Sequence, residues 1–185
     1  SLVAILLEKK GSLRAIENKG IFPLDLALRK EMIALGTVLI RGGSTVKLET
    51  LETLFRTYQA RVFYLKKNFE YNERFTILTK ETEQLNSLLQ TILLCGAATG
   101  SLTSDVLSYL SRKTASLKGE GIRYDINLKD ATGATAMHYA AMYGKDEVIK
   151  LLYHFGAEES LLIQDYTEPH RTIVAKHENF NGYSK

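Results

Sequence analysis

The sequence predicts an all-α fold built from short helical hairpins that stack on one another. Apolar residues recur at steps of three and four along most of the chain, as they do on one face of a helix. Residues 130–157 contain two short amphipathic segments bounded by glycines, and a related pattern occurs at residues 17–43. Helical hairpins this short cannot bury their apolar faces alone, so neighbouring units must cover them.

The hairpin at residues 130–157 has the clearest pattern, DATGATAMHYAAMYGKDEVIKLLYHFGA. Gly133 is expected to permit a tight turn, and Thr135 is expected to begin the first helix. Ala140 and Ala141 are small enough to let the two helices approach closely. Gly144 is expected to end the first helix and Gly156 the second. The second helix is expected to bury one face, formed by Val148, Ile149, Leu151 and Leu152.

The order D-x-x-G-x-T-A-M-H-x-A-A-x-x-G, followed by V-x-x-L-L and G-A, resembles an ankyrin repeat. This resemblance implies a helix-turn-helix solenoid that binds proteins rather than a catalyst. It also implies that Thr135 and His138 have a structural role, in which hydroxyl and imidazole connect adjacent loops. We therefore expect residues 124–157 to form one well-matched repeat, whose lead-in begins at Tyr124.

A second, degenerate copy is expected within residues 1–44. Aligning Gly133 with Gly20 places Pro23 at the start of a helix, where proline is favoured. The copy departs from the family pattern at Phe22, Asp25 and Glu31, which replace the Thr, the His and the inter-helix Gly. Apolar residues further upstream match the second helix of a preceding repeat: Val3, Leu6 and Leu7. Because there is also no initiator Met, we expect the chain to be part of a longer protein.

Residues 45–123 lack the repeat signature, although they are strongly helical in pattern. The apolar spacing predicts a long helix with one apolar face from Leu48 to Phe69, and a second helix that ends near Gly96. A third helix is predicted around Val106–Leu117, with Ser104 or Thr103 as its N-cap. Two interpretations stay open, a helical insertion or degenerate repeats with long helices; three helices do not divide into pairs, which favours the insertion. A coiled coil is less favoured, because Leu54 and Phe63 widen the apolar face. Residues 158–185 are interpreted as a partial or capping repeat with a polar tail.

The composition argues against nucleic-acid binding and against a membrane-spanning segment. The net charge is +3 with Lys and Arg spread along the chain, which is not typical of a nucleic-acid-binding protein. No apolar run is long enough to span a membrane, and a single cysteine favours a reducing compartment, so a cytoplasmic location is expected.

No catalytic, cofactor-binding or metal-binding residues are predicted, and no cofactor is expected. Cys95 could in principle pair with one of the histidines His138, His154, His170 and His177, but it ends an apolar stretch that is typical of a buried structural thiol. His170 and His177 are not spaced as zinc ligands usually are. The small-residue turns lack the pattern of a phosphate-binding loop.

The family resemblance implies which residues face the concave, partner-binding surface. In the well-matched repeat these are Ala131, Thr132, Ala134, Met142 and Tyr143. In the degenerate copy they are Asn18, Lys19, Ile21, Arg29 and Lys30. Met and Tyr bury large areas at modest entropic cost, although Met142 or Tyr143 could instead pack on the middle segment. The basic pair Arg29 and Lys30 would suit an acidic partner.

The predicted function is a protein–protein interaction module with an unidentified protein partner, without nucleic acid or membrane. The alternative is a scaffold or regulatory segment for an enzymatic domain elsewhere in a longer chain, and a less favoured alternative is an enzyme that uses Cys95. Degenerate repeats with an unusual insertion also resemble ankyrin-bearing effectors of intracellular bacteria, which would imply the host cytosol. The sequence makes no prediction of oligomeric state.

Overall fold

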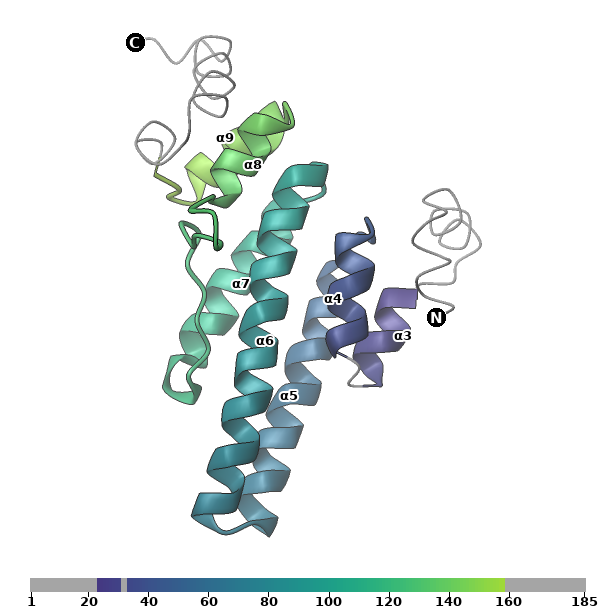
Figure 1. Cartoon of the computed structure of the whole chain (residues 1–185), viewed down its shortest axis with the longest axis vertical. Coiled ribbons are helices and arrows are strands. Elements are labelled where there is room, and N and C mark those ends of the chain that lie inside the picture. The colour runs from purple at the N-terminus through teal and green to yellow at the C-terminus, as the bar shows by residue number, and fades with distance from the viewer. Residues whose placement is uncertain (1–22, 31–32, 159–185) are drawn as a thin grey trace.

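The structure, a computed structural model, describes residues 23–30 and 33–158 of the chain (Figure 1). These residues form seven α-helices and one 3-10 helix, with no strand among them. In chain order the elements are α3 (Pro23–Arg29), α4 (Ile33–Arg41), α5 (Leu48–Asn68), α6 (Tyr71–Thr99), α7 (Ser104–Ser116), η1 (Lys118–Glu120), α8 (Ala136–Met142) and α9 (Asp146–His154). The predicted all-α fold is confirmed.

The first described hairpin, α3 and α4, packs through small and apolar residues. Pro23 is the first residue of α3, as its aligned position in the repeat suggested. Leu28 of α3 lies so close to Gly36 of α4 that a Cβ on Gly36 would come within 2.7 Å of the Leu28 side chain. The predictions for residues 1–22 and for Glu31 lie outside the described residues.

Two long helices, α5 and α6, form the centre of the molecule. The predicted seam of α5 is buried, with Leu51, Phe55 and Leu65 fully covered. Leu54 is also buried, but the expectation that Phe63 belongs to the same face is wrong, because 69 % of Phe63 is exposed. Successive helical residues are about 100° apart, so Phe63 points away from the core that its neighbour Val62 enters.

The second long helix ends three residues after Gly96, near which its end was predicted. Helix α6 continues through Gly96 to Thr99, and it ends at Gly100, whose φ of 75° lies in the left-handed region. Gly96 serves packing instead, since a Cβ there would lie 2.6 Å from a methyl group of Leu102. The missing side chain therefore lets the segment leading to α7 cross directly over α6.

Helix α7 and the turn that follows it are attached to α5 and α6. Of the two predicted N-caps, Thr103 is the one used, and its side chain accepts a hydrogen bond from the Val106 N–H. After η1, the Asn86 side chain of α6 donates to the Gly121 carbonyl at 3.1 Å and accepts the Arg123 N–H at 2.8 Å. Asn86 thus fixes the returning chain against α6.

The helices form two layers (Figure 1). Helix α5 contacts both α3 and α7, whereas α6 contacts both α4 and α8, and α9 packs on α8. The first layer therefore contains α3, α5 and α7, and the second layer contains α4, α6 and α8. The pair α5 and α6 stacks on the pair α3 and α4, while α7 is a single helix without such a pair. Because three helices separate α4 from α8, α8 lies in the second layer, although by sequence it is the first helix of a repeat.

One apolar core runs through both layers, from Leu24 and Leu28 at one end to Val148 and Leu152 at the other. Within the described ranges, no helix is both long enough and apolar enough to cross a membrane.

Candidate partner-binding surface

Asp130 organises the loop that leads into α8. Its carboxylate oxygen Oδ1 accepts the N–H groups of Thr132 at 2.8 Å and Ala134 at 3.0 Å, and also the Thr132 hydroxyl at 2.6 Å. The other oxygen, Oδ2, accepts the Tyr139 hydroxyl at 2.6 Å. The turn closes through a hydrogen bond from the Gly133 N–H to the Asp130 carbonyl, with Gly133 at a φ of 84°, so the predicted tight turn is confirmed.

These hydrogen bonds affect both ionisable groups. Burial alone would raise the pKa of Asp130, but the hydrogen bonds from Thr132, Tyr139 and the two backbone N–H groups together hold this pKa below its usual value. The hydrogen bond to the Asp130 carboxylate, together with burial, raises the pKa of Tyr139 to about 12. Asp130 is therefore a charged structural acceptor that ties the loop to α8.

Thr135 and His138 form a capping box at the start of α8. The Thr135 hydroxyl accepts the His138 backbone N–H at 3.4 Å, and His138 Nδ1 accepts the Thr135 backbone N–H at 2.9 Å. Both residues are buried, with exposed fractions of 1 % and 0 %. Since Nδ1 is an acceptor, the ring hydrogen lies on Nε2. His138 thus has a structural role, as expected, but these hydrogen bonds cap its own helix and do not connect adjacent loops.

Helices α8 and α9 pack against each other as the glycine pattern predicted. The link between them is closed by a hydrogen bond from the Lys145 N–H to the Ala140 carbonyl at 2.8 Å. Ala140 and Ala141 are buried between the helices, and Val148, Ile149 and Leu152 form the buried face of α9. At the end of this hairpin, the Glu158 N–H donates to the Asn127 side chain at 2.9 Å, which holds the end of the repeat to its lead-in loop.

Four of the five residues expected to face a partner in this repeat are accessible. Ala131 and Thr132 are exposed at the loop, Met142 is half-buried, and 56 % of Tyr143 is exposed. Ala134 differs, because only 2 % of it is exposed. Its N–H is held by Asp130, which turns the methyl group into the core. Ala131 and Thr132 precede the start of α8, whereas Met142 and Tyr143 lie at its end.

The residues expected from the degenerate copy lie elsewhere. Asn18, Lys19 and Ile21 are outside the described residues, whereas Arg29 and Lys30 are exposed at the end of α3. Helix α3 lies in the layer of α5 and α7, and α8 lies in the layer of α4 and α6. Arg29 and Lys30 therefore lie on a helix of the other layer from Met142, and their role in partner binding stays a prediction.

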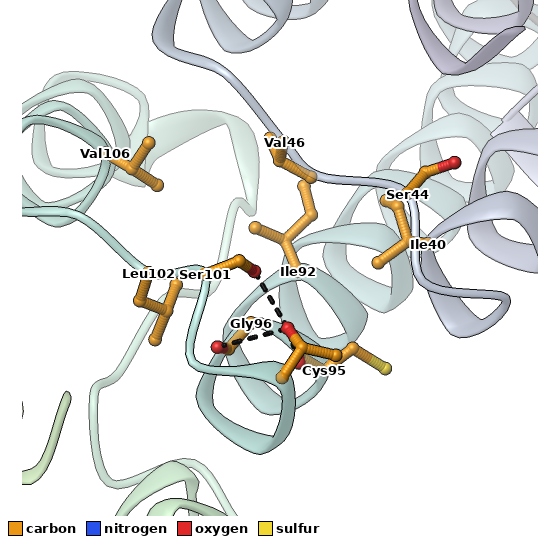
Figure 2. A pocket seen from close by; sticks show the side chains of 10 residues that line it. Ile40, Ser44, Val46, Ile92, Cys95, Gly96, Ser101, Leu102 and Val106 are labelled. Atoms are coloured by element: carbon orange, nitrogen blue, oxygen red, sulfur yellow. Dashed lines mark hydrogen bonds between the residues drawn. The ribbon is translucent and has the colours of Figure 1, made fainter. Parts of the chain in front are cut away.

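Cys95 lines a small cavity between α4, α6 and the segment that leads into α7 (Figure 2). The cavity holds about 10 Å³, roughly the volume required for one water molecule. Its lining contains no histidine: Ile40, Ser44, Val46, Ile92, Cys95, Gly96, Thr99, Ser101, Leu102 and Val106. Burial raises the pKa of the Cys95 thiol, which disfavours the nucleophilic thiolate. Nor do the described ranges contain a cluster of three or more residues of the types that ligate metals.

Sequence reasoning did not identify a surface groove beside the first turns of α6. The groove holds about 480 Å³ and includes the exposed rings of Tyr71 and Phe75. The spacing of Tyr71, Phe75 and Leu78, at steps of four and three, is the sequence signal that could have indicated it.

A family model for the ankyrin repeat matches residues 132–166. The match begins in the loop organised by Asp130 and includes α8 and α9, and its last residues, 159–166, lie outside the described part. No curated protein and no solved structure matches the chain. Residues 132–166 are therefore similar to one ankyrin repeat, and the described part of the chain is helical throughout its regular elements.

Proposed function

We propose that the chain is a protein-binding module whose partner contacts the loop and helix end of the C-terminal repeat. The observation that carries this proposal is the position of Thr132, Met142 and Tyr143. All three are accessible, and hydrogen bonds of Asp130 and the capping box tie the loop that carries Thr132 to the helix that carries Met142. A support held by such hydrogen bonds before binding lowers the entropic cost of binding.

Tyr143 is the proposed anchor of this surface. Its ring is more than half exposed, it directly follows the last residue of α8, and Met142 beside it offers a flexible apolar contact. Interface energy is usually concentrated in a few aromatic or Arg side chains surrounded by weaker contacts. Ala131 and Thr132 are proposed as such weaker contacts, together with the backbone around Ala134.

The division of the chain is also a proposal. We assign residues 1–44 to a partial repeat and a degenerate repeat, 45–123 to a helical insertion, 124–157 to the well-matched repeat, and 158–185 to a partial or capping repeat. The single helix α7 supports an insertion, because a set of complete repeats would add helices in pairs. We further propose a cytoplasmic location, supported by the single cysteine.

The test is affinity capture from a cell lysate with three matched baits: the wild type, the double variant Met142→Ala/Tyr143→Ala, and Tyr153→Ala. Tyr153 lies on α9 of the same repeat and has the same exposed fraction as Tyr143, 56 %. We expect a protein that the wild type and Tyr153→Ala retain and the double variant retains at least about tenfold less. Equal retention by all three baits would rule out this surface.

A further inference from the structure

The second layer continues from the C-terminal repeat to the first described hairpin. Helix α6 contacts α4 on one flank and α8 on the other, and the two lie on opposite sides of its upper half (Figure 1). Packed helices lie about 8–10 Å apart, so the distance from the axis of α4 to the axis of α8 is roughly 16–20 Å. A partner that contacts α8 can therefore reach α4 by crossing α6.

The helices on this path carry little charge. The second half of α6, from Gln84 to Thr99, contains no Asp, Glu, Lys or Arg, and neither does α8. Arg41, the last residue of α4, is exposed and has no ion-pair partner in the described part of the chain. Val38, one turn before it, is 37 % exposed. A positive charge thus borders a largely uncharged surface.

Electrostatic effects connect Arg41 to the surface around Tyr143. Burial raises the pKa of the Cys95 thiol on α6, and the positive charge of Arg41 opposes this rise. On α8, the hydrogen bond to Asp130 and burial raise the pKa of Tyr139 to about 12, with smaller contributions from Tyr143 and Cys95. Charges further apart than about 10 Å are largely screened from one another. Arg41, Cys95, Tyr139 and Tyr143 therefore form a row across α4, α6 and α8.

We propose that the partner of the C-terminal repeat also crosses α6 along this row and places an acidic side chain on Arg41. The inference rests on the proposed function, because it extends the surface of Met142 and Tyr143. A carboxylate suits Arg41, since guanidinium and carboxylate form two parallel hydrogen bonds. The acid that borders the row at α8, Asp130, already accepts four hydrogen bonds, so it offers little to a basic partner.

The dimensions of the row define the chemistry of the partner segment. It carries an apolar or aromatic side chain for Met142 and Tyr143, and an acidic side chain roughly 16–20 Å away for Arg41. An extended chain rises about 3.3 Å per residue, so about five or six residues connect the two side chains. The residues between them face the uncharged part of α6, where a buried charge would have no partner.

The first part of the test measures Kd by titration calorimetry with the purified partner that the wild type captures. Arg41→Glu places like charges together and should raise the Kd at least about tenfold. Arg41→Lys keeps the charge but not the paired donors, so it should weaken binding less. Arg56→Glu is the matched control, at an exposed Arg on α5 of the first layer, and should leave the Kd unchanged. Circular dichroism checks that each variant keeps the helical content of the wild type.

The second part needs no variant at Arg41. Cys95 is the single cysteine of the chain and is partly exposed, so its alkylation by N-ethylmaleimide reports whether α6 is covered. With the partner at about ten times its Kd, roughly nine-tenths of the chain is bound, so alkylation at Cys95 should slow about tenfold. Ser111→Cys in a Cys95→Ser background places the thiol on α7 of the first layer, where the partner should not change the rate.

The outcomes separate this inference from the proposed function. If Met142→Ala/Tyr143→Ala weakens binding but Arg41→Glu does not, or if the partner leaves alkylation at Cys95 unchanged, the inference is overturned while the proposed function stands. If the double variant binds as tightly as the wild type, or no partner is captured, the proposed function falls and the inference with it. Weaker binding in both variants together with protection of Cys95 supports the inference.

Discussion

Thr135 is a buried N-cap whose hydroxyl contacts both the backbone N–H and the ring Nδ1 of His138. Thr103 caps α7 with a single hydrogen bond at 3.3 Å and is exposed. We expect Thr135→Ala to lower the free energy of unfolding by about 2 kcal/mol and Thr103→Ala by at most about 1 kcal/mol. Urea unfolding of both variants measures this difference. Equal losses would contradict the role assigned to the buried capping box.

The hydrogen bond between Tyr139 and Asp130 predicts a dependence of stability on pH. The folded pKa of Tyr139, about 12, is above its unfolded value of about 10, so its contribution is complete below pH 10 and is lost as the pH rises toward 12. Tyr139→Phe should therefore be less stable than the wild type near neutral pH, and the difference should shrink above pH 10. Urea midpoints measured from pH 7 to 11 test this expectation.

The same pair makes a prediction at acid pH. The folded pKa of Asp130 is lowered, so its contribution is present above an unfolded pKa of about 4 and is lost as the pH falls through the folded value. Tyr139→Phe removes one donor to the carboxylate, so the acid-induced loss of stability should be smaller in the variant. Curves that run parallel from neutral to acid pH would contradict the assigned hydrogen bond.

At the scale of elements, Asn86 connects α6 to the chain that returns from α7. We expect Asn86→Ala to lower the free energy of unfolding by about 1 kcal/mol and to speed hydrogen exchange at the Arg123 amide, whose acceptor is removed. Gln90→Ala is the control, since Gln90 makes one longer hydrogen bond, 3.3 Å, to the Lys129 carbonyl on the same loop. Unchanged exchange at Arg123 in Asn86→Ala would show that other contacts hold this turn.

The elements also show why sequence reasoning succeeded for some helices and failed for others. The boundaries of α8 and α9 were predictable because apolar periodicity, the N-cap Thr135 and the glycines all agree. The end of α6 was predicted three residues too early, because Gly96 has the sequence signature of a helix stop. A glycine stands at position 96 because Leu102 packs closely against it, and sequence periodicity does not reveal such a neighbour in space. The burial of Phe63 was predicted wrongly for a similar reason, since an apolar residue beside a seam does not show which side of the helix is covered.

For the partner surface, the family pattern identified Met142 and Tyr143 but not the burial of Ala134. That burial follows from the hydrogen bond between the Ala134 N–H and Asp130, which depends on the folded loop. The groove beside Tyr71 and Phe75 was missed because it arises from the difference in length between α6 and α7. Such a difference has meaning only once it is known which helices lie side by side.

At the scale of the whole molecule, the number of helices determines which surfaces can act together. The three helices α5, α6 and α7 leave α3 and α8 in different layers, although both are first helices of their repeats in sequence. We therefore expect that one partner does not use Arg29 and Lys30 as a continuation of the surface around Tyr143. The account predicts that a protein partner is held by the C-terminal repeat and its neighbours in the second layer.

The most direct test is a comparison of Kd values, by titration calorimetry, for a purified captured partner and three forms of the chain. These are the wild type, Met142→Ala/Tyr143→Ala, and the charge-reversed pair Arg29→Glu/Lys30→Glu. The account predicts a Kd at least about tenfold weaker for the first pair and an unchanged Kd for the second. A partner that binds Met142→Ala/Tyr143→Ala as tightly as the wild type, or loses its affinity in Arg29→Glu/Lys30→Glu, would contradict it.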